Sequence, residues 1–292
     1  MMLSSQALHG QSAISTVTPP EPGELGRPSL LWSDLWRAPL HDFPIRDEIL
    51  CQFLPLSREM DVLEVGPGSG FTAFWLARQV RRLTLVEIGT DSLTHLRKQL
   101  RSRSNVEYVQ WDVSQPGLEK KLGKGFDAAF GLDVLEYVRD PGACLLNLAS
   151  ILRPDGKLVL SFPDTLPPAG DGVTYFQQKD EIETLLEQAD FRSWEICAVR
   201  LRADAAAVYK VSHDWPLRLY RYWQASARSP RPQIYDRTWA FQHRGQLERL
   251  KVPLNLFWMV LGKLMRVRGN AFVKLPASNG ILGRQVVIQA RR

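Results

Sequence analysis

The sequence has few of the residues that build disulfide frameworks and metal sites, with 3 cysteines and 5 histidines in 292 residues. Cys51, Cys144 and Cys197 are odd in number and form no Cys-x-x-Cys pair. This usage argues against a secreted disulfide scaffold and predicts a reducing compartment. The histidines form no His-x-x-x-His pair and no cluster with cysteine, so no metal site is expected.

Long apolar runs are scarce as well. The apolar stretch at 252–265 is shorter than the roughly 20 residues that a membrane-spanning helix needs. Residues 1–28 are rich in Ser, Pro and Gly and lack the basic start and apolar centre of a secretory signal, so we expect them to be disordered. The expected location is cytoplasmic, with peripheral membrane contact left open.

The most informative segment is Asp61–Gly70, which reads DVLEVGPGSG. Its Val/Leu-rich start predicts a strand covered on both faces. Glycines then follow at alternate positions, so a ligand can approach the backbone where no Cβ stands. The spacing is GxGxG, whereas the dinucleotide fingerprint is GxGxxG. Glu64, just before the first glycine, would repel a phosphate and suits a cationic amino-acid head group.

A second predicted strand, Leu83–Glu87, ends in an acidic residue 17 positions after Gly70. A carboxylate at this offset can accept hydrogen bonds from the two hydroxyls of a ribose. Together with Glu64, it indicates a nucleoside site. An oxidoreductase that uses a dinucleotide fits the alternating elements, but not the glycine spacing or Glu64.

These residues resemble the class I S-adenosylmethionine-dependent methyltransferases. Asn105–Asp112 is similar to the third strand of that family and to the acidic residue near the adenine amino group. Phe126–Pro141 resembles the fourth strand and following loop of the ubiquinone-biosynthesis-like, type 11 branch, and Leu152–Phe162 resembles the turn and fifth strand. The resemblance covers about residues 44–200 and the last strand.

The resemblance implies S-adenosylmethionine as the cofactor. It places the cofactor site on Glu64, Gly66, Gly68, Gly70, Glu87, Ile88, Trp111, Asp112 and Leu132. Two positions depart from the family pattern. Tyr137 stands where the branch usually has His, and Gly89 stands where an Asp is common, so neither receives a role from the resemblance.

The predicted fold is α/β, a doubly wound, mostly parallel, seven-stranded sheet of the Rossmann-like methyltransferase type. Strands and helices alternate along the chain, which implies βαβ units. The helix predicted over 44–56 could cap the cofactor or simply pack on the sheet. Residues 29–202 and 281–292 are expected to form the cofactor-binding domain. Residues 203–280 are expected to form a basic, aromatic, helical insertion that serves as a lid over the acceptor or as a membrane-surface element. The expected strands are 61–65, 83–87, 106–110, 126–132, 157–162, 193–200 and, as an antiparallel edge strand, 284–290.

The insertion differs from the rest of the chain in charge. Residues 200–292 hold 18 Lys and Arg and 4 Asp and Glu, a net charge of +14, whereas residues 1–199 hold 19 and 27, a net charge of −8. Aromatic residues are interleaved with these cations. Three interpretations stay open: a helical subdomain with its own aromatic core, a membrane-surface or lipid-linked substrate site with contact through 250–268, and nucleic-acid binding.

The loop after the fourth strand bears on the acceptor. Residues 131–134 read GLDV and lack the Asn/Asp-Pro-Pro-Tyr pattern with which amino-directed methyltransferases hold a nitrogen. The resemblance therefore favours an oxygen or carbon of a small-molecule or lipid-linked acceptor, and nucleic acid is disfavoured as a partner. An RNA-directed methyltransferase and a non-catalytic binding module remain alternatives, and the sequence indicates no oligomeric state.

A hydroxyl acceptor would gain from a general base. Candidates near the expected site are Asp133, Tyr137 and His213. Each also has a structural explanation: Asp133 at a strand end could bind cofactor or cap the backbone, and a lone His213 is more often structural than catalytic.

Overall fold

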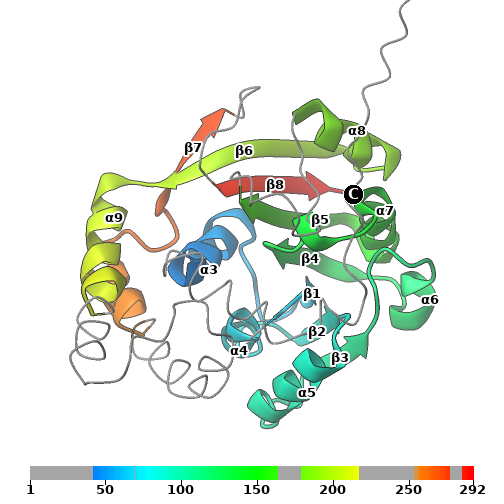
Figure 1. The fold of residues 1–292 in the computed structure, drawn as a ribbon, viewed down its shortest axis with the longest axis horizontal. Coiled ribbons are helices and arrows are strands. Elements are labelled where there is room, and N and C mark those ends of the chain that lie inside the picture. Colours follow the sequence, from blue (N-terminus) through cyan, green and yellow to red (C-terminus); the bar gives the residue numbers. More distant parts are fainter. Residues whose placement is uncertain (1–41, 69, 164–178, 217–253, 255, 277–284) are drawn as a thin grey trace, which may run out of the picture.

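The computed structural model describes residues 42–68, 70–163, 179–216, 254, 256–276 and 285–292 (Figure 1). The segment 1–28, expected to be disordered, lies outside them. Eight strands form one sheet in the order β3-β2-β1-β4-β5-β8-β6-β7. Their bounds are β1 Asp61–Val65, β2 Arg82–Glu87, β3 Val106–Gln110, β4 Phe126–Leu132, β5 Leu152–Pro163, β6 Ser193–Leu201, β7 Phe272–Pro276 and β8 Gln285–Arg291.

The first five strands are parallel and contain the motif strands. β1 lies between β2 and β4, with Val65 beside Val86 and Glu64 beside Phe130. Every residue of β1 is buried because helices cover both faces of the sheet. The chain order reverses between β1 and β4, which is the point where open α/β sheets bind ligands at the carboxyl ends of their strands.

The antiparallel part of the sheet, formed by β8, β6 and β7, differs from two expectations. The sheet has eight strands rather than seven, because β7 pairs with β6 inside the segment expected to be helical. The terminal strand β8 is not an edge strand, since it pairs with β5 on one side and β6 on the other. Its apolar Val286, Val287 and Ile288 are fully buried, as an interior position requires.

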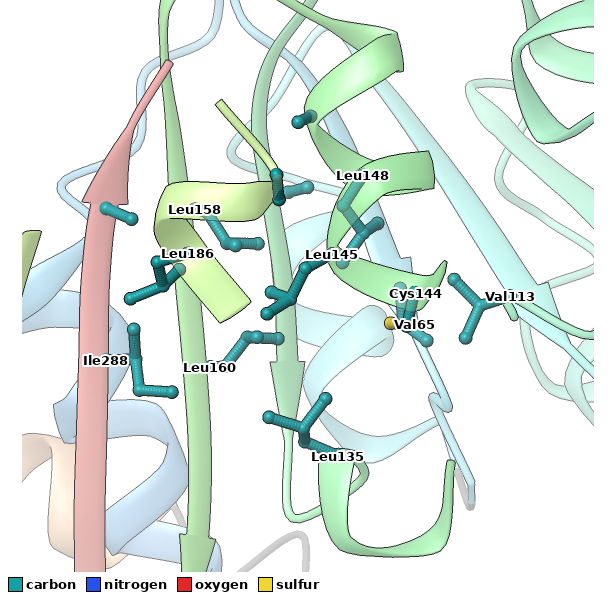
Figure 2. Close-up of a cluster of buried hydrophobic side chains, with 14 of the residues drawn as sticks. Val65, Val113, Leu135, Cys144, Leu145, Leu148, Leu158, Leu160, Leu186 and Ile288 are labelled. Atoms are coloured by element: carbon teal, nitrogen blue, oxygen red, sulfur yellow. The ribbon is translucent and has the colours of Figure 1, made fainter. Parts of the chain in front are cut away.

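The helices cover the two faces of the sheet in two groups. The first comprises α3 (Asp42–Phe53), α4 (Phe71–Leu76) and α5 (Thr90–Gln99), and the second α6 (Leu118–Leu122), α7 (Pro141–Ile151) and α8 (Lys179–Gln188). Strand residues alternate between them: Val62 packs with the first group, Leu63 and Val65 with the second. Figure 2 shows the second core, where Leu145 and Leu148 of α7 face the sheet.

The insertion forms a third, smaller core. It contains α9 (Ala203–Tyr209), η3 (Lys210–Asp214) and a helix over 256–264. Trp258 is fully buried against Tyr209, with ring centroids 6.1 Å apart in an edge-to-face arrangement. These two aromatic side chains agree with a subdomain that has its own core, whereas the aromatics of 217–253 lie outside the described residues.

Helix α3 joins this insertion to the sheet domain. The Trp258 indole donates to Glu48 Oε1 (3.2 Å) and the Gly269 amide donates to Glu48 Oε2 (2.5 Å). Arg268 Nη1 lies 2.6 Å from Asp47 Oδ2. Arg268, expected among the basic residues of a membrane-contact segment, is therefore committed to an internal ion pair. Among the described residues, no helix combines the length and apolarity needed to cross a bilayer.

Candidate functional site

The predicted cofactor residues gather at the carboxyl ends of four neighbouring strands. Gly66 follows β1, Ile88 follows β2, Trp111 follows β3, and Leu132 ends β4. Because these strands are parallel and adjacent, their ends share one edge of the sheet. The structure thus brings together residues far apart in sequence; their cofactor-binding roles stay predictions.

The glycine loop has a left-handed backbone at all three glycines, with φ of 61° at Gly66, 51° at Gly68 and 72° at Gly70. Only glycine adopts this region without strain. A Cβ on Gly66 would lie 2.3 Å from Val134 Cγ2, and one on Gly70 would lie 2.2 Å from Leu96 Cδ2. Gly66 and Gly70 are therefore required by the protein's own packing, in addition to any approach of a ligand.

Glu64 is a buried carboxylate at the end of β1. The residue is only 4 % exposed, and its Oε2 atom has no hydrogen-bond partner among the described residues. The pKa of Glu64 is raised to about 8, chiefly by burial, with Arg46 opposing the shift and the nearby Glu87 adding to it. An unsatisfied buried carboxylate oxygen is costly, and a cationic ligand group would relieve that cost.

Glu87 ends β2 and is also buried. The Gly89 amide donates to Glu87 Oε1 at 3.0 Å. Burial raises the pKa of Glu87, while the backbone amides of Gly89, Ile88 and Gly68 act in the opposite direction. The Gly68 amide belongs to the glycine loop, so the carboxylate lies beside this loop, where a ribose acceptor is predicted.

The loop after β3 is held by short internal hydrogen bonds. Asp112 Oδ1 accepts from the Ser114 amide (2.9 Å) and the Ser114 hydroxyl (2.6 Å). The Trp111 indole donates to the Gln115 carbonyl at 3.3 Å. Trp111 and Asp112 are half-buried, so both remain accessible at the edge of the sheet.

Asp133, the first candidate base, is at the centre of a polar network. Its Oδ2 lies 2.9 Å from Arg46 Nε and 2.8 Å from Arg46 Nη2. Its Oδ1 accepts from Ser161 Oγ (3.3 Å) and from Gln285 Nε2. This is the arrangement of an anchored carboxylate, and its backbone φ of 55° is unusual for a residue other than glycine.

Sequence reasoning did not find the partners of Asp133. Arg46 comes from α3 and Gln285 from the start of β8, 87 and 152 positions away along the chain. Arg46 lies on the helix for which the sequence left open two roles, capping the cofactor or packing on the sheet, and the first of these was the one available signal. The sequence carried no such signal for Gln285, because the interior position of β8 in the sheet was not predicted.

The other two candidates lie in different parts of the structure. Tyr137 ends the short helix η2 (Leu135–Tyr137) on the same loop as Asp133 and is half-buried. His213 lies in η3 of the insertion, and its side chain is outside the described residues. In the part of the chain that the structure describes, no group of three or more His, Cys, Asp and Glu could hold a metal ion.

Comparison with known families agrees with this arrangement. Residues 63–158, from β1 into β5, match the family described as a methyltransferase domain. This part of the chain is similar to methyltransferase domains, the class of protein that the sequence predicts. The expected family and the expected fold class are thereby confirmed, apart from the strand count and the place of the last strand.

Two relatives show how far sequence similarity extends. The ubiquinone biosynthesis O-methyltransferase of Xanthomonas euvesicatoria pv. vesicatoria is 32 % identical over 133 residues, covering 45 % of this chain and 54 % of the relative. The ribosomal RNA small subunit methyltransferase A of Fusobacterium nucleatum is 35 % identical over 83 residues, 27 % of this chain and 31 % of the relative. The chain spans about half the length of the ubiquinone relatives that it matches.

Solved structures share the fold at low identity. A Haemonchus contortus phosphoethanolamine N-methyltransferase 2, in complex with phosphomonomethylethanolamine and S-adenosylhomocysteine, superposes with a TM-score of 0.52 at 13 % identity, covering 86 % of this chain and 52 % of that one. A possible histamine N-methyltransferase from Thermotoga maritima superposes with a TM-score of 0.51 at 14 % identity, covering 93 % of this chain and 99 % of that one. At such identities the likeness shows the fold alone.

Proposed function

We propose that this protein binds S-adenosylmethionine and transfers its methyl group to an oxygen or carbon of a small-molecule or lipid-linked acceptor. The observation that carries the proposal is the unsatisfied, buried Glu64 carboxylate beside a left-handed glycine loop. The match of residues 63–158 to a methyltransferase domain supports it.

The residues present fit that cofactor. The Glu64 carboxylate would receive the ammonium of the methionyl part, and the glycine loop would lie along it. Glu87, held by the Gly89 amide, would accept from the ribose hydroxyls. Trp111 and Asp112 would border the adenine. When bound, S-adenosylmethionine supplies an activated methyl group.

The remaining task of the protein is positional. Methyl transfer is an in-line displacement, so donor and acceptor must be aligned and kept from water. The Arg46–Asp133 pair at the end of β4 fixes the loop on which Tyr137 lies. Since both Asp133 oxygens already accept hydrogen bonds, we assign Asp133 to positioning and leave Tyr137 and His213 as candidates for a general base.

The choice of acceptor rests on the loop after β4. Gly131–Val134 lacks the pattern that holds a nitrogen acceptor, and several relatives carry the name ubiquinone biosynthesis O-methyltransferase. An RNA acceptor is the second candidate, because the same domain also matches a ribosomal RNA methyltransferase.

Free Cys51, Cys144 and Cys197 support a reducing, cytoplasmic location.

Labelled S-adenosylmethionine tests the proposal directly. We expect calorimetric binding of S-adenosylmethionine but not of NAD(P), and label transfer to a small molecule or lipid in a fractionated cell extract. Label recovered in RNA would select the second candidate. Binding without formation of S-adenosylhomocysteine would indicate a non-catalytic module, and no binding would refute the proposal.

A further inference from the structure

The helix over 256–264 exposes an apolar face to solvent. The side chains on this face, which we call the outer face, are large and mostly exposed, Leu264 at 73 % and Leu256 at 52 %. Its members are Leu256, Phe257, Val260, Leu264 and the following Met265. Residues 256, 260 and 264 repeat every four positions, so they form one stripe along the helix.

The opposite face of the same helix already completes the core of the insertion. Leu254 and Trp258 are buried there, and Trp258 packs on Tyr209 and donates to Glu48. The helix is therefore apolar on both sides, although one side suffices for the fold. Apolar faces left exposed in this way mark interaction sites.

Charge around the outer face indicates the kind of partner. Lys263 and Arg266 are exposed beside it, and residues 254–268 contain no Asp or Glu. Arg268 is not part of this border, because it pairs with Asp47. A protein partner's surface commonly mixes both signs, whereas an apolar stripe with exposed cations and no acidic residue within 254–268 matches an acyl layer beneath anionic head groups.

We infer that the outer face docks onto an anionic lipid surface, with its apolar side chains at the boundary between head groups and acyl chains and with Lys263 and Arg266 among the head groups. The helix lies at the side of the molecule near α9, remote from α7 and α8 (Figure 1). Its attachment to α3 through Glu48 fixes the docked orientation of the sheet domain. This inference concerns binding and does not depend on methyl transfer.

Vesicle co-sedimentation of the full chain tests the inference. We expect the protein to pellet with vesicles of phosphatidylcholine and phosphatidylglycerol and much less with phosphatidylcholine alone. Raising the salt from 0.1 M to 1 M shortens the Debye length from about 10 Å to about 3 Å, so it should release much of the bound protein.

Two paired substitutions test the apolar stripe and the cations in turn. Val260→Asp with Leu264→Asp should lower the partition coefficient at least tenfold, given about 1.5–3 kcal/mol for burying one such side chain. Lys263→Ala with Arg266→Ala should lower it about thirtyfold on anionic vesicles, at about 1 kcal/mol per cation. Because these side chains are exposed, the thermal unfolding midpoints should stay near that of the parent.

Matched controls come from other exposed positions. Leu146→Asp on α7 replaces an apolar side chain that is 52 % exposed, and Lys120→Ala with Lys121→Ala removes two exposed cations on α6. Both controls should bind vesicles as the parent does. If the controls lose binding equally, the attraction is diffuse and the outer face is not the docking site.

Other outcomes would assign the face to another partner. A parent protein that fails to pellet with anionic vesicles overturns the inference. If it instead sediments as a dimer that Leu264→Asp dissociates, the face joins two copies of the chain. If it binds RNA with the same dependence on Lys263 and Arg266 and ignores vesicles, the basic border serves nucleic acid.

Discussion

Two buried glutamates on the α3 side of the sheet differ in whether the protein satisfies them. Glu48 on α3 is fully buried, and both its oxygens are occupied, by the Trp258 indole and the Gly269 amide. Glu64 on β1 is almost as buried, yet its Oε2 has no partner among the described residues. Burial raises the pKa of both. Glu48 therefore joins two parts of the chain, whereas the unpartnered oxygen of Glu64 is the basis of our proposal that this residue receives a ligand.

Replacing Glu48 should have the largest effect on stability. Glu48→Gln keeps the size of the side chain but loses the charge-assisted bond from Gly269 and the attraction to Arg268. We expect the free energy of unfolding to fall by about 2–3 kcal/mol, measured by urea denaturation. Affinity for S-adenosylmethionine in the folded fraction should be unchanged. A variant as stable as the parent would show that Glu48 does not fasten the insertion.

Replacing Glu87 should reduce cofactor affinity most. Glu87→Ala removes charge-assisted hydrogen bonds of about 1.5–3 kcal/mol each, so binding should weaken by one to two powers of ten. Calorimetry with a 2′-deoxy analogue provides the control, because the parent should lose affinity for it and the variant should not discriminate. Equal affinity of the parent for both compounds would exclude a ribose contact.

Replacing Glu64 should weaken cofactor binding and spare stability, which is the opposite of what we expect from replacing Glu48. Glu64→Gln should weaken S-adenosylmethionine binding about tenfold, since a neutral amide cannot pair with an ammonium. Its free energy of unfolding at pH 8 should equal or exceed that of the parent, because an unsatisfied buried charge is removed. A marked loss of stability in this variant would mean that Glu64, like Glu48, serves the fold.

The pH dependence of stability should report on the Glu64 carboxyl group. The folded pKa of Glu64 is about 8, above its ordinary value of 4.5, so the folded state holds the extra proton between these values. Stability therefore falls as pH rises, by at most about 1.4 kcal/mol per pH unit from this group. Glu48 and Glu87 shift in the same direction, so the quantity to measure is the difference between the parent and Glu64→Gln from pH 5 to 8.

The sequence predicted local elements better than their long-range pairing. The strands Asp61–Val65 and Phe126–Leu132 were predicted with the observed bounds, because uninterrupted apolar runs beside turn residues define buried strands. β7 was missed, since five residues ending in proline carry little periodic signal. The interior place of β8 depends on pairing with β5 and β6, which no local pattern encodes.

The residues of the candidate site show the same contrast between local signals, which the sequence carries, and long-range contacts, which it does not. Glu64 and Glu87 could be found because each occupies a fixed offset from the glycine loop. The Arg46–Asp133–Gln285 network could not, because it joins both ends of the chain. The charge count of the insertion could not tell the internally paired Arg268 from the exposed Lys263.

Proton release on cofactor binding tests most directly the claim that Glu64 awaits a cationic ligand. At pH 6.5 the free protein should carry Glu64 protonated, and pairing with an ammonium should ionise it. Calorimetric titration in buffers of different ionisation enthalpy should show the parent releasing close to one proton per S-adenosylmethionine bound, and Glu64→Gln releasing none. Binding by the parent without proton release, or with the same release as the variant, would contradict the account.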